Sequence, residues 1–472
     1  MSEQKDFCNM EYAAYPQRWI LLSILCVVSF SQIYSSSGFI LLNGIVAHFY
    51  RVTPYYTDLL AIIGSALGFP VGLVSAYFSD ILSLRSLMLG LILALLSGSF
   101  ICAIGFISRD LFYVAALGRV ITSSTFGTMF TTQVLLAANW FPSSETAMAF
   151  SLPVVTLTLG SVASSLIYPH AIPKLHLNNV TSGNDTNWDQ TGEVSTLFCS
   201  TFGTFIASSL ICLVLTIINC KNQPPSPPSR AQEEMLTKNF NKKHKVNTSR
   251  ISEMWNITRQ RSFILMTLAS SFQKSQLAYS VFLLPSCVLM TFPDLKNTVP
   301  GKIVLIATFG QIIGVIVTGK LLDKFKAFKL TIITGQLIMT TSCIGLFFAH
   351  SHRNLPSLYI LYSIMNFSGG GFLPASIELL VETTYPSNKL LLMSLYTSFS
   401  NLAVFIFTTI VRMVMMNAGV PIATVAVSGF LLISTTAVCL VPPEYKRQKA
   451  DNGVRYLDVD DKQNVTDESP VE

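Results

Sequence analysis

The stretch Gly319-Lys-Leu-Leu-Asp323-Lys324-Phe-Lys326-Ala-Phe-Lys329 is a charged hinge between two apolar runs, each long enough to cross a bilayer. The stretch Ala76-Tyr-Phe-Ser-Asp80-Ile-Leu-Ser-Leu-Arg85 repeats this plan, and its acid lies 243 residues (323 − 80) before the acid of the hinge. A second pair of loops, Asn139-Trp-Phe-Pro142-Ser-Ser and Thr383-Thr-Tyr-Pro386-Ser-Asn, repeats with a shift of 244 residues (386 − 142). Two features that recur with nearly the same shift indicate a duplicated chain with two halves of similar length.

The composition is that of a membrane protein. Of the 472 residues, 51% are hydrophobic and only 12% are charged, and the mean hydropathy is +0.52. This is too little charge to cover a soluble globule of this size. Runs of about twenty apolar residues match the hydrocarbon thickness of a bilayer, and the alternation typical of barrel strands is absent. The expected class is therefore an all-α integral membrane protein.

Hydropathy predicts twelve spans, six before a polar middle segment and six after it. The predicted spans are 19–42, 57–79, 86–107, 112–139, 147–169, 198–219, 263–286, 302–322, 329–349, 356–381, 390–415 and 420–441. The corresponding domains are a cytosolic N-terminus (1–18), an N-terminal six-helix half (19–219), a cytosolic linker (220–262), a C-terminal six-helix half (263–441) and a cytosolic tail (442–472).

The orientation follows from the distribution of positive charge. Most of the 31 Lys and Arg residues fall in segments on the side of the membrane that holds both termini. That bias predicts that both termini are cytosolic. The loop between predicted spans 5 and 6 carries two glycosylation acceptors, Asn179 and Asn184, on the opposite side. Charge and glycosylation signals therefore favour the same topology.

Six plus six spans, with a G-x-x-x-D-basic motif between spans 8 and 9 and a degenerate copy between spans 2 and 3, resemble the major facilitator superfamily. Arg18-Trp19, Trp140-Phe141-Pro142 and Glu378-Leu-Leu-Val-Glu382-Thr-Thr-Tyr385-Pro386 resemble the family of haem, choline and vitamin transporters named for the feline leukaemia virus subgroup C receptor. Ser400-Asn401 and the tail Arg455-Tyr456-Leu457-Asp458-Val459 are similar to its disrupted-in-renal-carcinoma branch, which is lysosomal and associated with pyridoxine and proton movement. The resemblance implies a twelve-helix major facilitator fold of two six-helix halves.

The chain departs from this family at positions that matter for choline. Ser36 stands where choline-transporting members have a tryptophan, and Thr158 where they have a glutamine. A quaternary ammonium would lose its best aromatic face. Phe39 and Tyr34 are near enough to form another aromatic wall, and Asn401 keeps an amide. A choline-like cation, a pyridoxine-like vitamin and haem therefore all stay open as substrates, with protons as a candidate coupling ion.

Among the charged residues in predicted apolar spans, we single out Arg119, Lys274 and Glu378. Each costs on the order of 3 kcal/mol at bilayer depth unless it is paired or hydrated. The resemblance places all three on the cavity-lining spans 4, 7 and 10. The functional hypothesis is that Lys274 and Glu378 form a pair that solute or a proton breaks during transport. The alternatives are a permanent structural pair or a lysine that snorkels to the interface. Arg119 is interpreted as an interfacial anchor.

Neutral hydrogen-bonding groups on the same spans complete a predicted transport site. The candidate substrate-binding residues are Lys274, Glu378, Phe39, Tyr34, Gln133, Asn366, Asn401 and Gln276. The candidate gating residues are Asp80, Arg85, Asp323, Lys324, Glu145 and Glu382. The hinge charges are interpreted as latches at the cytosolic face, and simple topology marking is the alternative.

The leading hypothesis is a secondary transporter of a small organic solute that works by alternating access. The alternative is a non-transporting membrane receptor or scaffold on the same fold. No catalytic constellation of His, Cys and Asp occurs at membrane depth, so an enzyme is not expected, and neither is a cofactor or a metal site. The expected partners are the solute and the lipid bilayer, with no nucleic acid. The expected location is the lysosomal or the plasma membrane.

Overall fold

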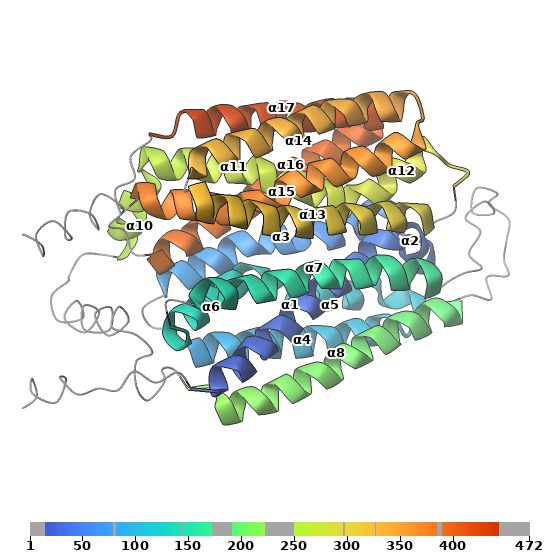
Figure 1. Cartoon of the computed structure of the whole chain (residues 1–472). Coiled ribbons are helices and arrows are strands. Elements are labelled where there is room, and N and C mark those ends of the chain that lie inside the picture. The colour runs from blue at the N-terminus through green and yellow to red at the C-terminus, as the bar shows by residue number, and fades with distance from the viewer. Residues whose placement is uncertain are drawn as a thin grey trace, which may run out of the picture.

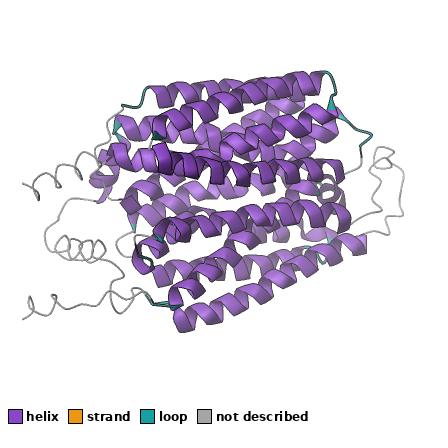
Figure 2. Ribbon diagram, viewed as in Figure 1, coloured by secondary structure: helices purple, strands orange, loops and turns teal. Residues whose placement is uncertain are grey.

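The computed structural model describes residues 15–78, 82–142, 145–171, 191–221, 250–295, 298–325, 327–384 and 389–442. Regular structure in this part of the chain is helical, as Figure 2 shows. The long helices run side by side as one bundle. In Figure 1 the blue and green helices of the N-terminal half form the lower block, and the yellow to red helices of the C-terminal half form the upper block.

The helices of the N-terminal half are α1 (Gln17–Leu41), α2 (Asn43–Tyr50), α3 (Pro54–Tyr77), α4 (Leu84–Gly105), η2 (Arg109–Leu111), α5 (Phe112–Ser124), α6 (Phe126–Trp140), α7 (Thr146–Ala171) and α8 (Thr191–Asn219). The remaining helices are α10 (Arg250–Thr258), α11 (Arg261–Ala278), η4 (Tyr279–Leu283), α12 (Leu284–Thr291), α13 (Thr298–Phe325), α14 (Phe328–Ser351), α15 (Leu355–Thr384), α16 (Lys389–Ala418) and α17 (Val420–Cys439).

Ten helices within the described residues are long and apolar enough to cross a membrane. The other two predicted spans are broken into shorter helices. The fourth span divides into α5 and α6 around Thr125. The seventh divides into α11 and α12 around the π-helical turn η4, which ends two residues before Pro285 in α12. Proline has no backbone N–H and cannot bond to the preceding turn, so a local change of helix type before it is expected.

Two helix pairs make the most extensive contacts between the two halves. Helix α3 packs against α16, and α7 packs against α13. Within the halves, α1 packs against α7, α4 against α5, and α15 against both α13 and α14. The α3–α16 contact joins residues more than 300 positions apart in sequence. It places α3 and α16 side by side on the seam between the halves.

A very close helix approach inside the C-terminal half depends on glycine. Gly314 on α13 is buried, and a Cβ atom built on it would overlap the backbone carbonyl of Phe367 on α15. Backbone atoms cannot give way as a flexible side chain can. Gly319, one and a half turns further along the same helix, has no neighbouring atom within 4 Å of such a Cβ.

We therefore expect Gly314→Ala to destabilise the protein by about 1–3 kcal/mol, because the added methyl group forces α13 away from α15. The matched change Gly319→Ala should be neutral or stabilising by up to about 1 kcal/mol, since alanine is the better helix former. Thermal unfolding of the purified protein in detergent measures both. Equal midpoints for the two variants would contradict the close approach.

Candidate functional site

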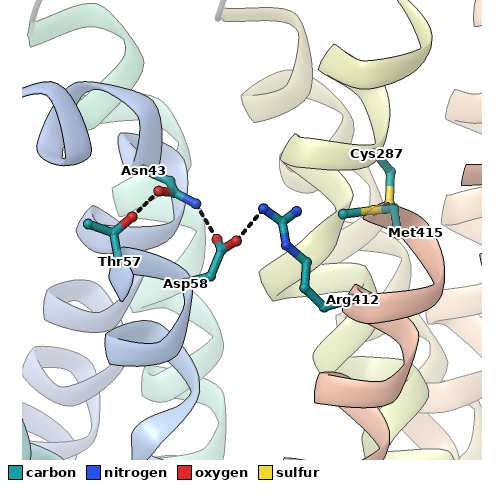
Figure 3. A network of polar contacts seen from close by, with 6 residues as sticks. All are labelled: Asn43, Thr57, Asp58, Cys287, Arg412 and Met415. Carbon is teal, nitrogen blue, oxygen red and sulfur yellow. Dashed lines mark hydrogen bonds and ion pairs between the residues drawn. The ribbon is translucent and has the colours of Figure 1, made fainter. Parts of the chain in front are cut away.

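An ion pair joins the two halves near the predicted exoplasmic end of the seam. Asp58 on α3 contacts Arg412 on α16 through Oδ2 and Nη2, and its Oδ1 accepts a hydrogen bond from Asn43 Nδ2 on α2. Thr57 Oγ1 donates to Asn43 Oδ1. Figure 3 shows the four side chains in a row that leads from the N-terminal half to the C-terminal half. We call Asn43, Thr57, Asp58 and Arg412 the outer latch.

The outer latch is largely withdrawn from solvent, since the side chains of Asp58 and Arg412 are each only 12% exposed. A cavity of about 10 Å³ beside it has room for about one water molecule. The cavity is lined by Asp58, Ile62, Phe282, Leu283, Thr408 and Arg412. Either charge would be poorly solvated without the other, so removing one partner costs free energy. The pair thus links the two halves at this end of the seam.

Sequence reasoning missed the outer latch. Asp58 is the second residue of a predicted span, a position where charged residues are common, and Arg412 lies near the opposite end of its own span. Each residue alone is consistent with a membrane-interface position. The available signal was the combination of an acid on span 2 with a base on span 11. That signal has meaning only once these two spans are known to pack together.

Lys274 lies on α11 at the interface with α16. Its Nζ atom is 4.6 Å from the ring centroid of Tyr396, which is itself fully buried. Tyr396 OH is 3.2 Å from Ser376 Oγ on α15. The ammonium of Lys274 therefore occupies an aromatic face that could otherwise attract a cation. Glu378 lies on α15, but its side chain is outside the described part of the structure, so the predicted pairing with Lys274 stays a prediction.

The interpretation of Arg119 as an interfacial anchor is wrong. Its side chain is only 1% exposed and reaches three neighbouring groups within the N-terminal half. Nη2 donates to Ser36 Oγ at 2.5 Å, Nε to the Leu60 carbonyl at 3.3 Å, and Nη1 to Thr122 Oγ1 at 3.4 Å. The guanidinium also lies 5.8 Å from the ring centroid of Phe39. These hydrogen bonds replace hydration, which is why burial is tolerated.

The predicted amide ligands differ in how well they are partnered. Asn366 on α15 donates to the Tyr362 carbonyl at 2.9 Å and accepts from Ser280 Oγ at 3.0 Å, which is a helix-packing role. Gln133 on α6 donates to Ser29 Oγ on α1 at 3.4 Å. Gln276 on α11 is buried and has no hydrogen-bond partner among the described residues. Of these three, Gln276 has the most capacity left for a ligand.

Phe39 and Tyr34 belong to an aromatic cluster inside the N-terminal half. The Phe39 ring centroid lies 5.8 Å from that of Phe106, and the Tyr34 centroid lies 5.0 Å from that of Tyr168. Both residues are buried against α4, α7 and α8. Their contacts are those of a packed core, and a role in substrate binding stays a prediction for both.

The structure describes the side chains of four of the six predicted gating residues, Glu145, Arg85, Lys324 and Glu382. Glu145 pairs with Arg18 at 3.0 Å, and Arg85 Nη2 is 3.5 Å from the Ile217 carbonyl, so both contacts stay within the N-terminal half. Lys324 is exposed on α13, and Glu382 is buried on α15. Asp80 lies outside the described residues, as do Asn179 and Asn184, and Asp323 lies on α13 with a side chain that is not described. Gating by these residues stays a prediction.

The middle of the seam is closed by direct contact of α3 with α16. A Cβ atom on Gly68 of α3 would lie 3.1 Å from both Cβ and Cγ of Asn401 on α16. Thr131 Oγ1 on α6 is also 3.3 Å from Ser394 Oγ on α16. Asn401, predicted to bind substrate, is therefore a residue of the contact between the halves.

We expect Gly68→Ala to weaken the closed seam by about 1–3 kcal/mol, because the new methyl group overlaps the Asn401 amide. Adding Asn401→Ala should recover most of that loss, because it removes the overlapping amide. Asn401→Ala alone should cost little stability. A double-mutant cycle on the unfolding midpoint measures the coupling between the two positions. Additive effects would mean that the two helices do not touch here.

Two related helical blocks that meet along a polar seam make up an architecture that many membrane transporters share. The chain belongs to the Major Facilitator Superfamily, which it matches over residues 25–300 and 279–460. This confirms the predicted twelve-helix fold. Its relatives include the choline/ethanolamine transporter FLVCR1 of Mus musculus, 24% identical over 96% of this chain and 80% of the relative. They also include an uncharacterised transporter of the same superfamily from Caenorhabditis elegans, C09D4.1, 25% identical over 94% of this chain and 72% of the relative.

Solved structures show the same fold in two conformations. A bacterial homologue of the human lysosomal transporter Spinster, inward-facing and unoccupied, aligns with a TM-score of 0.63 and 14% identity over 91% of this chain and 98% of that one. FucP in an outward conformation also aligns with a TM-score of 0.63 and 14% identity, over 90% of this chain and 99% of that one. At these identities the likeness concerns the fold alone.

Proposed function

We propose that the chain is a secondary transporter that carries a small organic solute across the membrane by alternating access between its two halves. The outer latch is the observation that supports this most directly. It is a charge pair between the halves, on helices that pack along the seam, with a water-sized cavity beside it. A contact of this kind has two discrete states, made and broken, as a gate requires.

The choline/ethanolamine transporters among the relatives make these two solutes the first to test. A pyridoxine-like vitamin and haem are the other candidates that the resemblance implies. The charge of Lys274 bears on this choice, because a cationic solute near Tyr396 would compete with the chain's own ammonium. Binding of a cation and protonation of Lys274 would then oppose one another. Such opposition would couple movement of the solute to movement of protons in the other direction, which we include in the proposal.

The test is uptake of labelled choline, ethanolamine, pyridoxine and haem into vesicles that contain the purified full-length protein, with and without a pH gradient. Lys274→Ala and Glu378→Gln are measured in parallel. We expect one of the solutes to enter, and the pH gradient to change its rate in the wild type and not in the variants. If none of the four moves although the protein is folded, the transporter proposal fails for these solutes and the receptor alternative gains support.

We further propose that both termini are cytosolic, as the distribution of Lys and Arg indicates. Asn179 and Asn184 would then be glycosylated on the exoplasmic or lumenal side, in the lysosomal or the plasma membrane. In cells, Asn179→Gln and Asn184→Gln should each remove one glycosidase-sensitive step in electrophoretic mobility. A wild-type protein without any such shift would count against this topology.

A further inference from the structure

Two glutamine side chains, one in each half, are buried without a hydrogen-bond partner among the described residues. Gln32 on α1 and Gln276 on α11 are each 1% exposed. In both residues the amide nitrogen and the amide oxygen lack a partner within this part of the chain. An amide in a dry interior loses the hydrogen bonds it made to water, so an unpartnered one destabilises the folded protein. Such groups are rare in native structures and need an explanation.

The two glutamines occupy equivalent positions of the duplicated chain. They are 244 residues apart (276 − 32), the same shift that relates Pro142 to Pro386. Each lies fifteen residues beyond the first residue of its helix, Gln17 for α1 and Arg261 for α11 (32 − 17 and 276 − 261). At about 1.5 Å per residue both therefore lie roughly 22 Å along their helices, past the middle of a ~30 Å hydrocarbon layer.

Several polar groups near the two glutamines have protein partners. On α1, Ser29 accepts from Gln133 and Ser36 accepts from Arg119, one turn before and one turn after Gln32. On α11, Gln273 donates to the Gly369 carbonyl at 3.0 Å, one turn before Gln276. Ser35 Oγ, three residues after Gln32, also lacks a partner among the described residues, but in Gln32 and Gln276 both amide atoms are unpartnered.

The two helices also approach each other across the seam. Helix α1 contacts η4, the turn that directly continues α11. A Cβ atom on Gly369 of α15 would lie 3.6 Å from Gln276 Oε1, so the amide oxygen faces a stretch of α15 that has no side chain there. The duplication therefore places one unsatisfied amide on α1 and one on α11, and α1 contacts the turn that continues α11.

We propose that Gln32 and Gln276 together bind the hydroxyl group of the transported solute. This rests on the proposed transport function and assigns a hydroxyl subsite to it. An amide donates through Nε2 and accepts through Oε1, and a hydroxyl group matches it because it also donates and accepts. A carboxylate only accepts and would leave both amide oxygens unsatisfied. A trimethylammonium group offers neither a donor nor an acceptor.

The first experiment measures uptake kinetics of choline, ethanolamine and pyridoxine with the full-length protein in vesicles. For the solute that is transported, Gln32→Leu and Gln276→Leu should each raise KM about tenfold and the double variant about a hundredfold, with the maximal rate within about threefold of wild type. An analogue without the hydroxyl group, such as ethyltrimethylammonium in place of choline, should be discriminated against by the wild type and not by the double variant.

The matched control is Gln336→Leu. Gln336 is a buried amide on α14 whose Nε2 donates to Ser434 Oγ on α17 at 2.6 Å, so it joins two helices of the C-terminal half. This variant should leave KM and hydroxyl discrimination unchanged. Unchanged KM values in both Gln32→Leu and Gln276→Leu, with wild-type transport intact, would overturn the proposed site and leave the transporter proposal standing.

The second experiment needs no transport. Thermal unfolding of the purified protein should show an equal or higher midpoint for Gln32→Leu and Gln276→Leu, by up to about 2 °C, and a lower midpoint for Gln336→Leu. Millimolar choline, ethanolamine or pyridoxine should raise the midpoint of the wild type and not that of the double variant. Binding of one of these solutes without its uptake would contradict the transport proposal and leave the proposed binding site standing. Lower midpoints for both glutamine variants, or no shift with any of the three solutes, would overturn the proposed site.

Discussion

Asp58→Asn and Arg412→Gln are each expected to slow solute uptake at least tenfold. Either change leaves the other charge partly buried without its partner. The loss for a buried pair is of order 3 kcal/mol, and about 1.4 kcal/mol already corresponds to a factor of ten in rate. The effect should fall on closure of the predicted exoplasmic end, because both residues lie there and link α3 to α16. Initial uptake rates in vesicles with matched protein amounts provide the measurement.

The double variant Asp58→Asn/Arg412→Gln separates the charge effect from lost packing. It removes both charges, so it should transport better than either single variant.

Opening can be followed independently with Thr408→Cys, because Thr408 is buried beside the latch. A membrane-impermeant maleimide should label this cysteine faster when Asp58→Asn is also present. Labelling of a parent protein without Thr408→Cys gives the background to subtract. Equal labelling with and without Asp58→Asn would show that the latch does not close this end.

Arg119→Lys is expected to cause the largest loss of stability among the variants considered. Arg119 reaches acceptors on α1, α3 and α5 through three different nitrogens, and a lysine has only one. Hydrogen bonds from a charged donor contribute about 1.5–3 kcal/mol each, so the loss of two costs about 3 kcal/mol or more. The unfolding midpoint and the yield of folded protein should both fall strongly.

Arg353→Lys is the control for Arg119→Lys, because Arg353 is exposed in the short loop between α14 and α15. It should change stability by less than about 0.5 kcal/mol, as expected for a surface substitution. A comparable loss in both variants would mean that general sensitivity to lysine, and not the hydrogen bonds of Arg119, accounts for the result.

Much of the fold could be predicted from the sequence because hydropathy and duplication are properties of local stretches. Broken helices were harder to predict. The fourth and seventh spans have the length of single helices, and only the structure shows their division at Thr125 and at η4. The site was predicted in part. Lys274 and Gln276 were recognised as polar residues in an apolar run, whereas Asp58 and Arg412 were not singled out because they lie near span ends.

The sequence by itself determined the class of the protein and the repeat of about 244 residues. It also showed which polar residues lie in apolar spans, where they cost free energy unless they are partnered. Each of these results depends only on composition and spacing along the chain. Only the tertiary structure decided which polar groups meet. Asp58 pairs with Arg412, and Arg119 is buried between three helices. The equivalence of Gln32 and Gln276 was already in their spacing, but their lack of partners was not. These outcomes depend on which helix faces pack together, and residues hundreds of positions apart become neighbours only through that packing.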